Sequence, residues 1–501
     1  MKWLTKSDYL KFLTHPAYLW LQKHNKEKLP AFDDTTQAII DAGNVIEEYA
    51  RQLFPEAALV KSLFADSVRE TEGYVKDDAK VIFQAAVLTD RRLYAKADVL
   101  MKNPDGSWDL VEVKSATKEK PEYIHDLSFQ KNAFEVSGYE IRRTRLIHIN
   151  NQYVRRGAIE PDKLFTMVDV TAQVDAMMSR TRRGVEEALD VIALPQPPSD
   201  DPAQCKNWYA WRDVYAHLHP DRPENSIYNL ARLDLKQVRE LAKLGVERLE
   251  DIPPSFELKP AQTEQLAALR AGEPIIHPVK IAHHLAKLHF PLYFFDYETV
   301  GGGIPLYEGT RPYQQVPFQY SLHILREPGG RLEHREFLAT GRDNPVPALL
   351  QQMQQDIEPE GSVIVWYKGF EMGVNEMMAK QYPECADFLR GVNKRVYDLM
   401  EIFSNYYYND ARFGGASSLK RVLPVLVPEL KYSDLEIQEG GTAQLRWEQA
   451  AFGKMSGEEA AKVFADLRTY CGQDTLAMVK IYEFLLDAKE TSPGAQLTLL
   501  G

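Results

Sequence analysis

The chain has 501 residues, of which 44% are hydrophobic and 26% are charged, and its formal net charge is −12. This length exceeds a single hydrophobic core and predicts roughly two to four domains. The acidic balance argues against a protein that coats nucleic acid indiscriminately. The first residues lack the apolar stretch of a signal peptide, and no run approaches the ~20 apolar residues of a membrane span. We therefore expect a cytoplasmic protein without a membrane partner.

Two breaks divide the chain. The segment 193–204 is rich in Pro and Asp, which is typical of a linker, and a weaker break follows at 271–280. We expect an α/β (α+β) protein with an N-terminal domain at 1–192, a helical middle region at 193–275 and a C-terminal domain at 276–501. In the middle region, 230–253 has apolar residues at helical spacing on both sides of Gly245. That pattern resembles a helix-hairpin-helix, and a simple helix pair is the alternative.

The segment 93–116 predicts two strands joined by a turn at 103–106. Glu112 and Lys114 are two residues apart and therefore project from the same strand face, and pairing can bring Asp98 of the first strand close to Glu112. Two carboxylates beside one ammonium suit phosphodiester hydrolysis, because the carboxylates can hold Mg²⁺ or Mn²⁺ and the lysine can orient a water. The alternative is an exposed hairpin with ordinary charges.

These residues resemble the RecB-type branch of the PD-(D/E)xK nucleases, in the order ADVL, LVEVKSAT and HDLSFQKNAFEVSGYE, over about residues 1–170. The resemblance implies a restriction-endonuclease-like fold and a catalytic glutamine at Gln130 on a helix. It also implies a further metal-facing acid in GNVIEEYARQLFP, with Glu48 as the best candidate and Glu47 as the alternative.

Many RecB-type relatives bind an iron–sulfur cluster through four cysteines. Here His15 stands in the place of the early cysteine, and Cys205 alone remains at the late site. The other two of the three cysteines, Cys385 and Cys471, are distant, and no CxxC pair exists. We expect no cluster, and we expect the aromatic residues Trp208, Tyr209 and Trp211 to pack in its place.

The C-terminal part contains a second set of acids. The apolar run PLYFFDYET predicts a buried strand that carries Asp296 and Glu298 on one face. The segment SVIVWYKGFEMGVNEMMA predicts a strand, a turn and a helix, with Glu371 where the helix begins. The segment 460–488 predicts a long amphipathic helix, in which Tyr470 and Asp474 share one face at a spacing of four residues.

These pieces resemble the DEDD exonucleases of the ribonuclease H-like fold, in the subtype with a tyrosine before the last acid. The resemblance implies that Asp296, Glu298, Glu371 and Asp474 hold two metal ions and that Tyr470 orients the attacking water. Glu371 replaces the usual Asp, and Asp398 is the alternative acid. With both resemblances, the chain is similar to a bacterial family in which a RecB-type nuclease domain is fused to a DEDD-like C-terminal domain.

We therefore expect a Mg²⁺- or Mn²⁺-dependent nuclease of DNA processing, repair or defence, with DNA favoured over RNA as the substrate. The first alternative is an RNA-processing exonuclease whose N-terminal domain only binds. The second is a non-catalytic scaffold that binds nucleic acid. No GxxxxGK[ST] motif occurs, so any helicase function must come from a partner protein.

Overall fold

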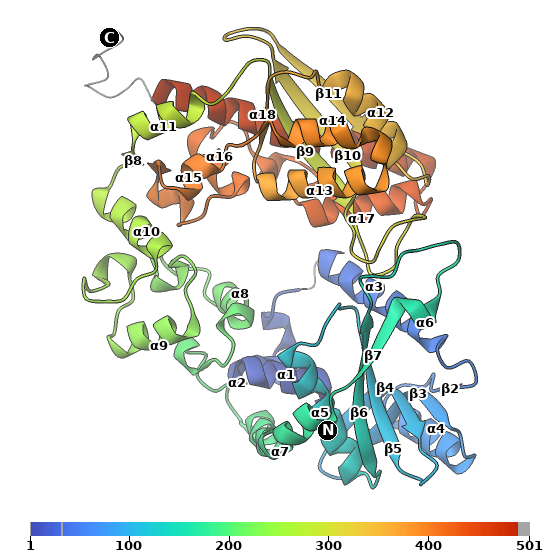
Figure 1. Cartoon of the computed structure of the whole chain (residues 1–501). Coiled ribbons are helices and arrows are strands. Elements are labelled where there is room, and N and C mark those ends of the chain that lie inside the picture. Colours follow the sequence, from blue (N-terminus) through green and yellow to red (C-terminus); the bar gives the residue numbers. More distant parts are fainter. Residues whose placement is uncertain (1, 32–33, 489–501) are drawn as a thin grey trace. The chain divides into compact units, whose positions relative to one another are not determined.

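The computed structural model describes residues 2–31 and 34–488 and divides the chain into two compact units. The first unit comprises Met1–Pro223, Leu233–Gly245 and Gly302–Tyr313, and the second comprises Glu224–Arg232, Val246–Gly301 and Gln314–Gly501. Both units mix helices and strands, which confirms the expected α+β class (Figure 1). The segment 193–275 is divided between the two units, and the proposed three-part division stays a prediction.

The first unit is built on a seven-stranded sheet with the order β2-β3-β4-β5-β6-β7, and β1 pairs with β4 off this path. Its strands are β1 (Leu4–Thr5), β2 (Ala58–Leu59), β3 (Val81–Leu88), β4 (Leu93–Lys102), β5 (Trp108–Lys114), β6 (Ile141–Ile149) and β7 (Phe165–Asp169). Its described α-helices are α1 (Lys6–Thr14), α2 (Pro16–His24), α3 (Asp34–Arg51), α4 (Phe64–Lys76), α5 (Pro121–Val136), α6 (Pro161–Leu164), α7 (Thr171–Ala193), α8 (Trp208–Leu218) and α9 (Leu235–Lys243).

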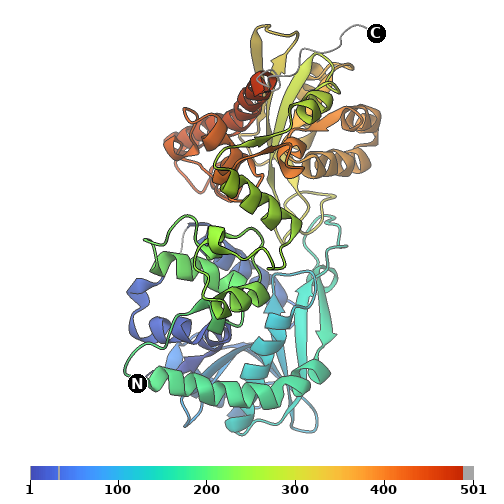
Figure 2. The same cartoon turned by 90° about the vertical axis from the view of Figure 1, so that its left-hand side faces the viewer.

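Two hydrophobic cores cover the two faces of this sheet. One face packs against α5, α7, α1 and α2, with Phe129 and Val174 among the buried residues, and Figures 1 and 2 show α5 and α7 beside the strands. The other face packs against α3 through Ile46 and Ala50, which contact strand residues such as Val111. The predicted acids Asp98 and Glu112 lie on β4 and β5, which are covered on both faces. A charged group can be buried there only where partners compensate its charge.

The predicted hairpin at 93–116 is confirmed. Strands β4 and β5 pair antiparallel, with Val99 opposite Val111 and Lys102 opposite Trp108. Gly106 closes the turn at φ +89°, a conformation that glycine adopts without steric cost. The pairing places Asp98 and Glu112 one step beyond the Val99–Val111 pair, on neighbouring strands.

The second unit is built on a five-stranded sheet with the order β11-β10-β9-β12-β13. Its strands are β8 (Ile275–Ile276), β9 (Leu292–Val300), β10 (Val316–Leu325), β11 (Leu332–Leu338), β12 (Ser362–Val365), β13 (Val396–Asp398) and β14 (Tyr408–Asn409), of which β8 and β14 form a separate pair. Its described α-helices are α10 (Pro260–Ala271), α11 (Pro278–Leu285), α12 (Val346–Asp356), α13 (Lys368–Gln381), α14 (Ala386–Asn393), α15 (Glu401–Ser404), α16 (Leu419–Leu426), α17 (Gly440–Ala451) and α18 (Gly457–Ala488).

Strand β9 lies at the centre of this sheet. It pairs antiparallel with β10 and parallel with β12, which in turn pairs parallel with β13, and β10 pairs antiparallel with β11. The predicted strand at PLYFFDYET, the strand–turn–helix at 362–381 and the long helix around Tyr470 are all confirmed as β9, β12 with α13, and α18. Helix α18 packs on β9 and β10 and brings its inner face to the centre of the sheet.

The helix-hairpin-helix interpretation of 230–253 is wrong. Only α9 forms as an α-helix in this segment, and it ends at Lys243, two residues before Gly245, which has φ +67°. After Gly245 there is no second helix: Arg248 forms an isolated β-bridge with Ser226, and Leu249–Asp251 form a short 3₁₀ turn. Leu249 and Ile252, which the helical spacing assigned to a second helix, are buried from a 3₁₀ turn and the residue after it. Tertiary packing therefore overrode the local pattern.

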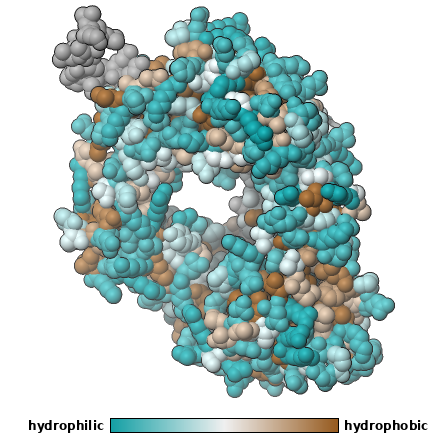
Figure 3. Space-filling view, viewed as in Figure 1, coloured by the Kyte–Doolittle hydropathy of each residue, from teal (hydrophilic) through white to brown (hydrophobic). Residues whose placement is uncertain are grey.

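Among the described helices, none has the length and apolar character that crossing a bilayer requires. The face of the molecule shown in Figure 3 is mostly hydrophilic, and its hydrophobic residues lie in small scattered groups.

Candidate active sites

The first unit brings the acids and the lysine of its predicted motif together. The backbone N–H of Val113 donates to Asp98 Oδ2 at 2.7 Å, which holds the Asp98 carboxyl beside β5. Glu112 is 1% exposed, and its Oε1 accepts from Lys114 Nζ at 2.6 Å. The predicted convergence of Asp98, Glu112 and Lys114 therefore exists as geometry, while their catalytic and metal-binding roles stay predictions.

Helix α5 supplies two further groups to this cluster. Gln130 is fully buried, and its Nε2 donates to Glu112 Oε2 at 2.6 Å and to Asp126 Oδ1 at 3.0 Å. Asp126 lies one helical turn before Gln130, is 2% exposed, and accepts from Lys114 Nζ at 2.6 Å. Gln130, which the RecB-type resemblance indicated, thus fixes the carboxylates of Glu112 and Asp126.

The upstream helix contributes Glu47 and not Glu48. The Glu48 side chain is 66% exposed and lies 3.8 Å from Arg51, so the choice of Glu48 as the metal-facing acid is a wrong placement. Gln84 Nε2 donates to Glu47 Oε1 at 2.5 Å and lies 3.5 Å from Asp98 Oδ1, which connects Glu47 to the cluster. Residues 47 and 48 point about 100° apart on a helix, so the packing of α3 on the sheet decided between them.

Gln84 has an unusual backbone. Its φ is +57°, a region that non-glycine residues rarely adopt. The neighbouring pairs Phe83–Val99 and Ala85–Ala97 are regular, so the deviation is confined to the position opposite Asp98. Such local strain persists where surrounding structure fixes it, and it aims the Gln84 amide at the two acids.

The charges of the first cluster are strongly coupled. Burial by itself opposes ionisation of Glu112, but Lys114 and Lys6 outweigh it and hold the pKa of that carboxyl well below its usual range. Burial raises the pKa of Asp98 to about 8, and the charge of Glu112 adds to the rise. Burial also raises the pKa of Asp126 and of Glu47. In the absence of metal, Glu112 therefore carries the negative charge and Asp98 holds a proton near neutral pH.

The residues considered for an iron–sulfur cluster form a packed contact. The ring of His15 stacks on that of Trp211 with centroids 4.2 Å apart, and its Nε2 lies 3.1 Å from the carbonyl oxygen of Asp201. Trp208 and Trp211 are buried, in agreement with the expected aromatic packing, whereas Tyr209 is 59% exposed and takes no part in it.

The second unit gathers its four predicted acids. Asp296 lies on β9, and the charges of Asp474, Glu298 and Glu371 all act on it. Glu298 is 7% exposed, Asp474 is 8% exposed and Glu371 is 4% exposed. A strand in the centre of the sheet, the first turn of α13 and the inner face of α18 thus meet at one cluster of carboxyls.

The alternative acid Asp398 has a different environment. Its carboxylate accepts the backbone N–H of Lys368 at 3.0 Å and that of Met400 at 3.1 Å, so it holds the start of α13 and the turn after β13. The charge of Glu371 raises the pKa of Asp296, the charge of Asp398 raises that of Glu371, and Glu371 Oε2 has no hydrogen-bond partner within the described residues 2–31 and 34–488. Both oxygens of Asp398 accept backbone N–H groups, whereas Glu371 keeps one oxygen available for a ligand, and the choice between the two acids stays a prediction.

Two tyrosines border the second cluster. Tyr470, which the sequence pointed to, precedes Asp474 by one turn of α18, and the hydroxyl of Tyr432, which it did not, donates to Asp474 Oδ1. Lys420 Nζ lies 5.7 Å from the centre of each tyrosine ring. Burial, together with the charge of Asp474, raises the pKa of both tyrosines far above their usual value, so both stay protonated.

Cys471 also belongs to this cluster. It is fully buried, and its Sγ lies 3.9 Å from Asp296 Oδ2. Ligand atoms of Asp296, Glu298 and Cys471 all lie within 4.8 Å of one another, a spacing that a single metal ion can bridge. No sequence pattern connects this cysteine to the two acids, and the packing of α18 on β9 brings them together.

Burial dominates the ionisation of the second cluster. It raises the pKa of Glu298 and of Glu371 to about 8, with the charges of Asp474 and Asp398 adding to the respective shifts. The pKa of Asp474 rises to about 6 because burial outweighs the hydrogen bond from Tyr432 and the charge of Lys420. The pKa of Asp296 rises well above its usual value.

Several basic residues of the first unit are engaged within it. Arg145 pairs with Asp109 at 2.9 Å, and Arg91 pairs with Glu186 at 2.7 Å. The Arg155 guanidinium donates to the carbonyl oxygens of Pro305 and Leu306, which holds the segment 302–313 on this unit. Arg145 and Arg155 therefore hold parts of this unit together, whereas the exposed Arg91–Glu186 pair contributes little to its stability.

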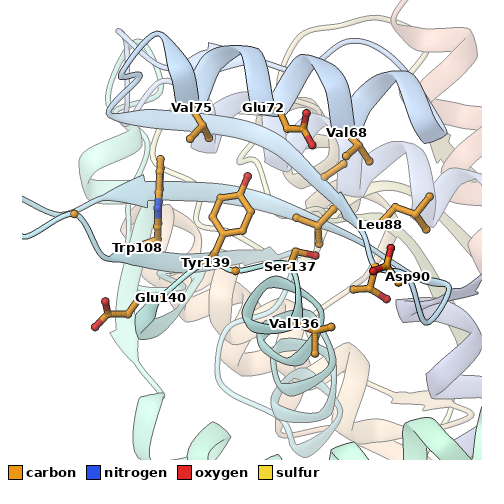
Figure 4. Close-up of a pocket in the computed structure, with 15 residues that line it drawn as sticks. Val68, Glu72, Val75, Leu88, Asp90, Trp108, Val136, Ser137, Tyr139 and Glu140 are labelled. Carbon is orange, nitrogen blue, oxygen red and sulfur yellow. The ribbon is translucent and has the colours of Figure 1, made fainter.

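A hollow of about 710 Å³ lies elsewhere in the first unit. Figure 4 shows Val68, Glu72 and Val75 of α4 on one side of it, with Trp108 and Tyr139 on the other. Its lining includes none of the predicted site residues. The two carboxyl clusters are therefore separate from this hollow.

Comparisons with known proteins add a partial family match. Residues 293–418 match a family described as a domain of unknown function (DUF2779), and this range contains Asp296, Glu298 and Glu371. The "Uncharacterized protein MG366" of Mycoplasma genitalium is 23% identical over 227 residues, which cover 40% of this chain and 33% of that protein. The "Uncharacterized protein UU173" of Ureaplasma parvum is 25% identical over 235 residues, which cover 40% of this chain and 32% of that protein. The chain thus spans about a third of the length of these curated relatives.

Sequence reasoning missed five residues of the two clusters: Lys6, Gln84, Asp126, Tyr432 and Cys471. Asp126 had a usable signal, because it precedes Gln130 by four residues and therefore shares its helix face. Lys6 is 106 residues from Glu112 in the chain, and no local pattern connects them.

Proposed function

We propose that the chain is a metal-dependent nuclease with two active sites, one in each unit, and that DNA is its substrate in preference to RNA. The first site is of the RecB-type PD-(D/E)xK kind, on a restriction-endonuclease-like domain. The second is of the DEDD exonuclease kind, on a ribonuclease H-like domain.

The observation that carries the proposal is the convergence of Asp98, Glu112, Lys114 and Gln130 in one buried cluster. They come from two strands and a helix, and no folding requirement of these elements calls for four polar groups at one buried position. The sheet of the second unit supports the second assignment: on one side of β9 the pairs β9–β10 and β10–β11 are antiparallel, and on the other side the pairs β9–β12 and β12–β13 are parallel.

Both donor sets suit a hard divalent cation. Carboxylate and amide oxygens are the ligands that Mg²⁺ and Mn²⁺ prefer. One oxygen in each cluster, Gln130 Oε1 and Glu371 Oε2, is buried and has no hydrogen-bond partner in the described part of the chain, 2–31 and 34–488. In the first site Asp98, Glu112 and Glu47 would hold the metal, and in the second Asp296, Glu298, Glu371 and Asp474 would hold it. A bound divalent cation would polarise the phosphate and lower the pKa of a coordinated water.

The side chains of the first site have distinct tasks. Gln130 and the Val113 N–H fix the orientation of Glu112 and Asp98. The Lys114 ammonium, anchored by Asp126 at 2.6 Å, presents positive charge where the phosphate's negative charge increases during hydrolysis. In the second site, Tyr470 stays protonated and can donate a hydrogen bond to the attacking water, while Tyr432 holds Asp474.

A cleavage assay tests the proposal. The full chain is incubated with Mn²⁺ or Mg²⁺ and end-labelled single- and double-stranded DNA and RNA, as wild type, Lys114→Ala, Asp296→Ala and the double variant. We expect EDTA to abolish cleavage, and each single variant to remove about 10²- to 10³-fold of the activity that depends on its own site. Glu48→Gln is the matched control for the first site, because its side chain is exposed and lies beside Arg51.

The outcomes separate the competing functions. Cleavage of RNA alone, lost in Asp296→Ala and kept in Lys114→Ala, would indicate an RNA exonuclease with a binding-only first domain. Binding without cleavage, unchanged by EDTA and by both substitutions, would contradict the nuclease proposal and favour a scaffold. Cleavage of DNA that both substitutions reduce would support two active sites.

A further inference from the structure

Lys6 reaches the first site from near the N-terminus, 106 residues before Glu112. Its Nζ lies 2.7 Å from Glu112 Oε1 and 3.4 Å from Asp126 Oδ1. The same Glu112 oxygen accepts from Lys114 Nζ at 2.6 Å. One carboxylate oxygen therefore binds two ammonium groups, and the other, Oε2, is bound by Gln130.

The position of Lys6 is fixed by its own local structure. Strand β1 pairs parallel with β4, with Thr5 opposite Tyr94, which places the start of α1 beside the strand that carries Asp98. Thr5 caps α1 through a reciprocal hydrogen-bond pair with Asp8, and Asp8 is held in turn by Lys23 at 2.5 Å. Lys6, the first residue of α1, is therefore held at the cluster by the fold of the N-terminus.

The two lysines are not equivalent. Lys114 has a second close contact, to Asp126 at 2.6 Å, and its side chain is 21% exposed. Lys6 has only the longer 3.4 Å contact to Asp126, and its side chain is 28% exposed. If a divalent cation takes Glu112 Oε1 as a ligand, Coulomb repulsion between the cations disfavours both ammonium groups beside that oxygen. Lys6 is the one expected to move away, because its remaining contact to Asp126 is longer than that of Lys114.

We propose that Lys6 is a second active-site lysine, which competes with the metal for Glu112 and contacts a phosphate oxygen of the nucleic acid once the metal occupies that position. This inference rests on the nuclease function proposed above. Lys6 then serves two states: it compensates the buried carboxylates in the metal-free protein, and it binds substrate in the loaded one. A lysine suits both, because its long side chain carries a compact charge through several rotamers.

The affinity for Mn²⁺ tests this inference, because removing a lysine with a purely structural role would not be expected to tighten metal binding. Titration calorimetry with Mn²⁺ is performed on the full chain in an Asp296→Ala, Asp474→Ala background, so that the first site dominates the heat. We expect Lys6→Met to bind Mn²⁺ about tenfold more tightly, because a competing cation at 2.7 Å has been removed. Lys6→Arg keeps the charge and is expected to bind like the parent.

The control is Lys11→Met on the same helix. Lys11 contacts Gln22 at 2.7 Å and the ring of Tyr18, away from the cluster, so its removal leaves Mn²⁺ affinity unchanged. In the assay at saturating Mn²⁺, first-site cleavage is expected to fall about 10²-fold in Lys6→Met and less in Lys6→Arg, through loss of a charge contact to phosphate. Circular dichroism checks the fold of each variant, and Lys6→Gln, whose amide can still donate to Glu112, replaces Lys6→Met if the latter does not fold.

Unchanged or weaker Mn²⁺ binding in the neutral Lys6 variants would overturn the inference and leave Lys6 as a structural ion pair. Unchanged cleavage alongside tighter binding would also overturn it, since the phosphate contact would be missing. Failure of the proposed nuclease function would look different. In that case the Asp296→Ala, Asp474→Ala protein would bind no Mn²⁺, or would bind it equally well after Glu112→Gln.

Discussion

The carboxyl clusters of the two units differ in what compensates their charge. In the first unit, two ammonium groups lie within 2.7 Å of Glu112, and they hold its pKa well below the usual range. In the second unit, Lys420 acts on Glu298 and Asp474 from a position over the rings of Tyr432 and Tyr470, and burial raises the pKa of all four acids. Two lysines therefore keep Glu112 ionised in the first cluster, although Asp98 there holds a proton, whereas all four acids of the second cluster have raised pKa values.

This difference teaches that a similar set of acids can be prepared for metal in two ways. Glu112 is ionised before any metal arrives, and a metal must displace an ammonium from it. In the second cluster Glu298 and Glu371 must first lose their protons, so a metal there competes with protons for the carboxylates. The following predictions are arranged to test this contrast, beginning with the largest effect.

Removal of the internal cation affects the first unit most. Lys114→Met leaves Glu112 and Asp126 with one lysine fewer at a buried position, and we expect it to destabilise the first unit by about 3 kcal/mol. Lys420→Met is the matched change in the second unit, and we expect about 1 kcal/mol or less because Lys420 is exposed. Pulse proteolysis in EDTA, with fragments assigned by mass spectrometry, measures each unit separately. Equal losses in the two units would contradict the contrast.

Divalent metal is expected to stabilise the second unit more than the first. At a concentration about 100 times its dissociation constant, a ligand that binds only the folded state contributes about 2.7 kcal/mol. In the first unit the displaced lysine contacts offset part of this gain, since the metal replaces stabilising ion pairs. Hydrogen exchange of peptides from α18 and from β5, with Mn²⁺ and with EDTA, compares the two clusters. Greater protection in β5 than in α18 would refute this expectation.

The metal-free second unit should lose stability as the pH rises. Folding raises the pKa of Glu298 and Glu371 to about 8, above the value of about 4.3 in an unfolded chain. Between these values the folded state binds more protons, so stability falls with rising pH, by up to about 1.4 kcal/mol per pH unit for each proton, and levels off above pH 8. In the first unit Asp98 acts in the same direction, but Glu112, whose pKa is lowered, favours the folded state above its unfolded pKa and loses this contribution only in acid.

Pulse proteolysis in EDTA from pH 5 to pH 8.5 measures this slope for each unit. The second unit is expected to become more susceptible across the range, and Glu298→Gln is expected to flatten its profile because the neutral amide has no proton to lose. A profile for the second unit that stays flat, or that rises in stability with pH, would show that its acids are ionised without metal.

The smallest effect concerns two adjacent residues of α3. Glu48→Gln removes an exposed charge, and we expect a change in stability within about 0.5 kcal/mol and unchanged Mn²⁺ affinity. Glu47→Gln removes an acid that Gln84 connects to Asp98, and we expect weaker Mn²⁺ binding by the first site. Calorimetry on the two variants decides between them. Weaker binding in Glu48→Gln alone would show that α3 presents a different face to the metal.

Much of the secondary structure followed from local patterns. The hairpin with Asp98 and Glu112, the buried strand with Asp296, and the helix with Tyr470 and Asp474 all formed where alternation, apolar runs and helical spacing predicted them. The segment 230–253 shows where such patterns fail, because its apolar residues after Gly245 are buried by a loop and a 3₁₀ turn. Its periodicity carried no information about which neighbour would cover it.

Fixed backbone periods place Glu112 with Lys114 on one strand face and Tyr470 with Asp474 on one helix face, so these pairs could be predicted without a structure. Long-range packing brings in the residues that meet them from elsewhere: Lys6 from the N-terminus, Glu47 instead of Glu48 from α3, and Cys471 against Asp296. The physical reason is that ionisation depends on all charges within a few ångströms, whichever part of the chain supplies them. The residue types and their spacing thus predicted two groups of acids, and long-range packing decided that lysines keep Glu112 ionised in one while burial raises the pKa of all four acids in the other.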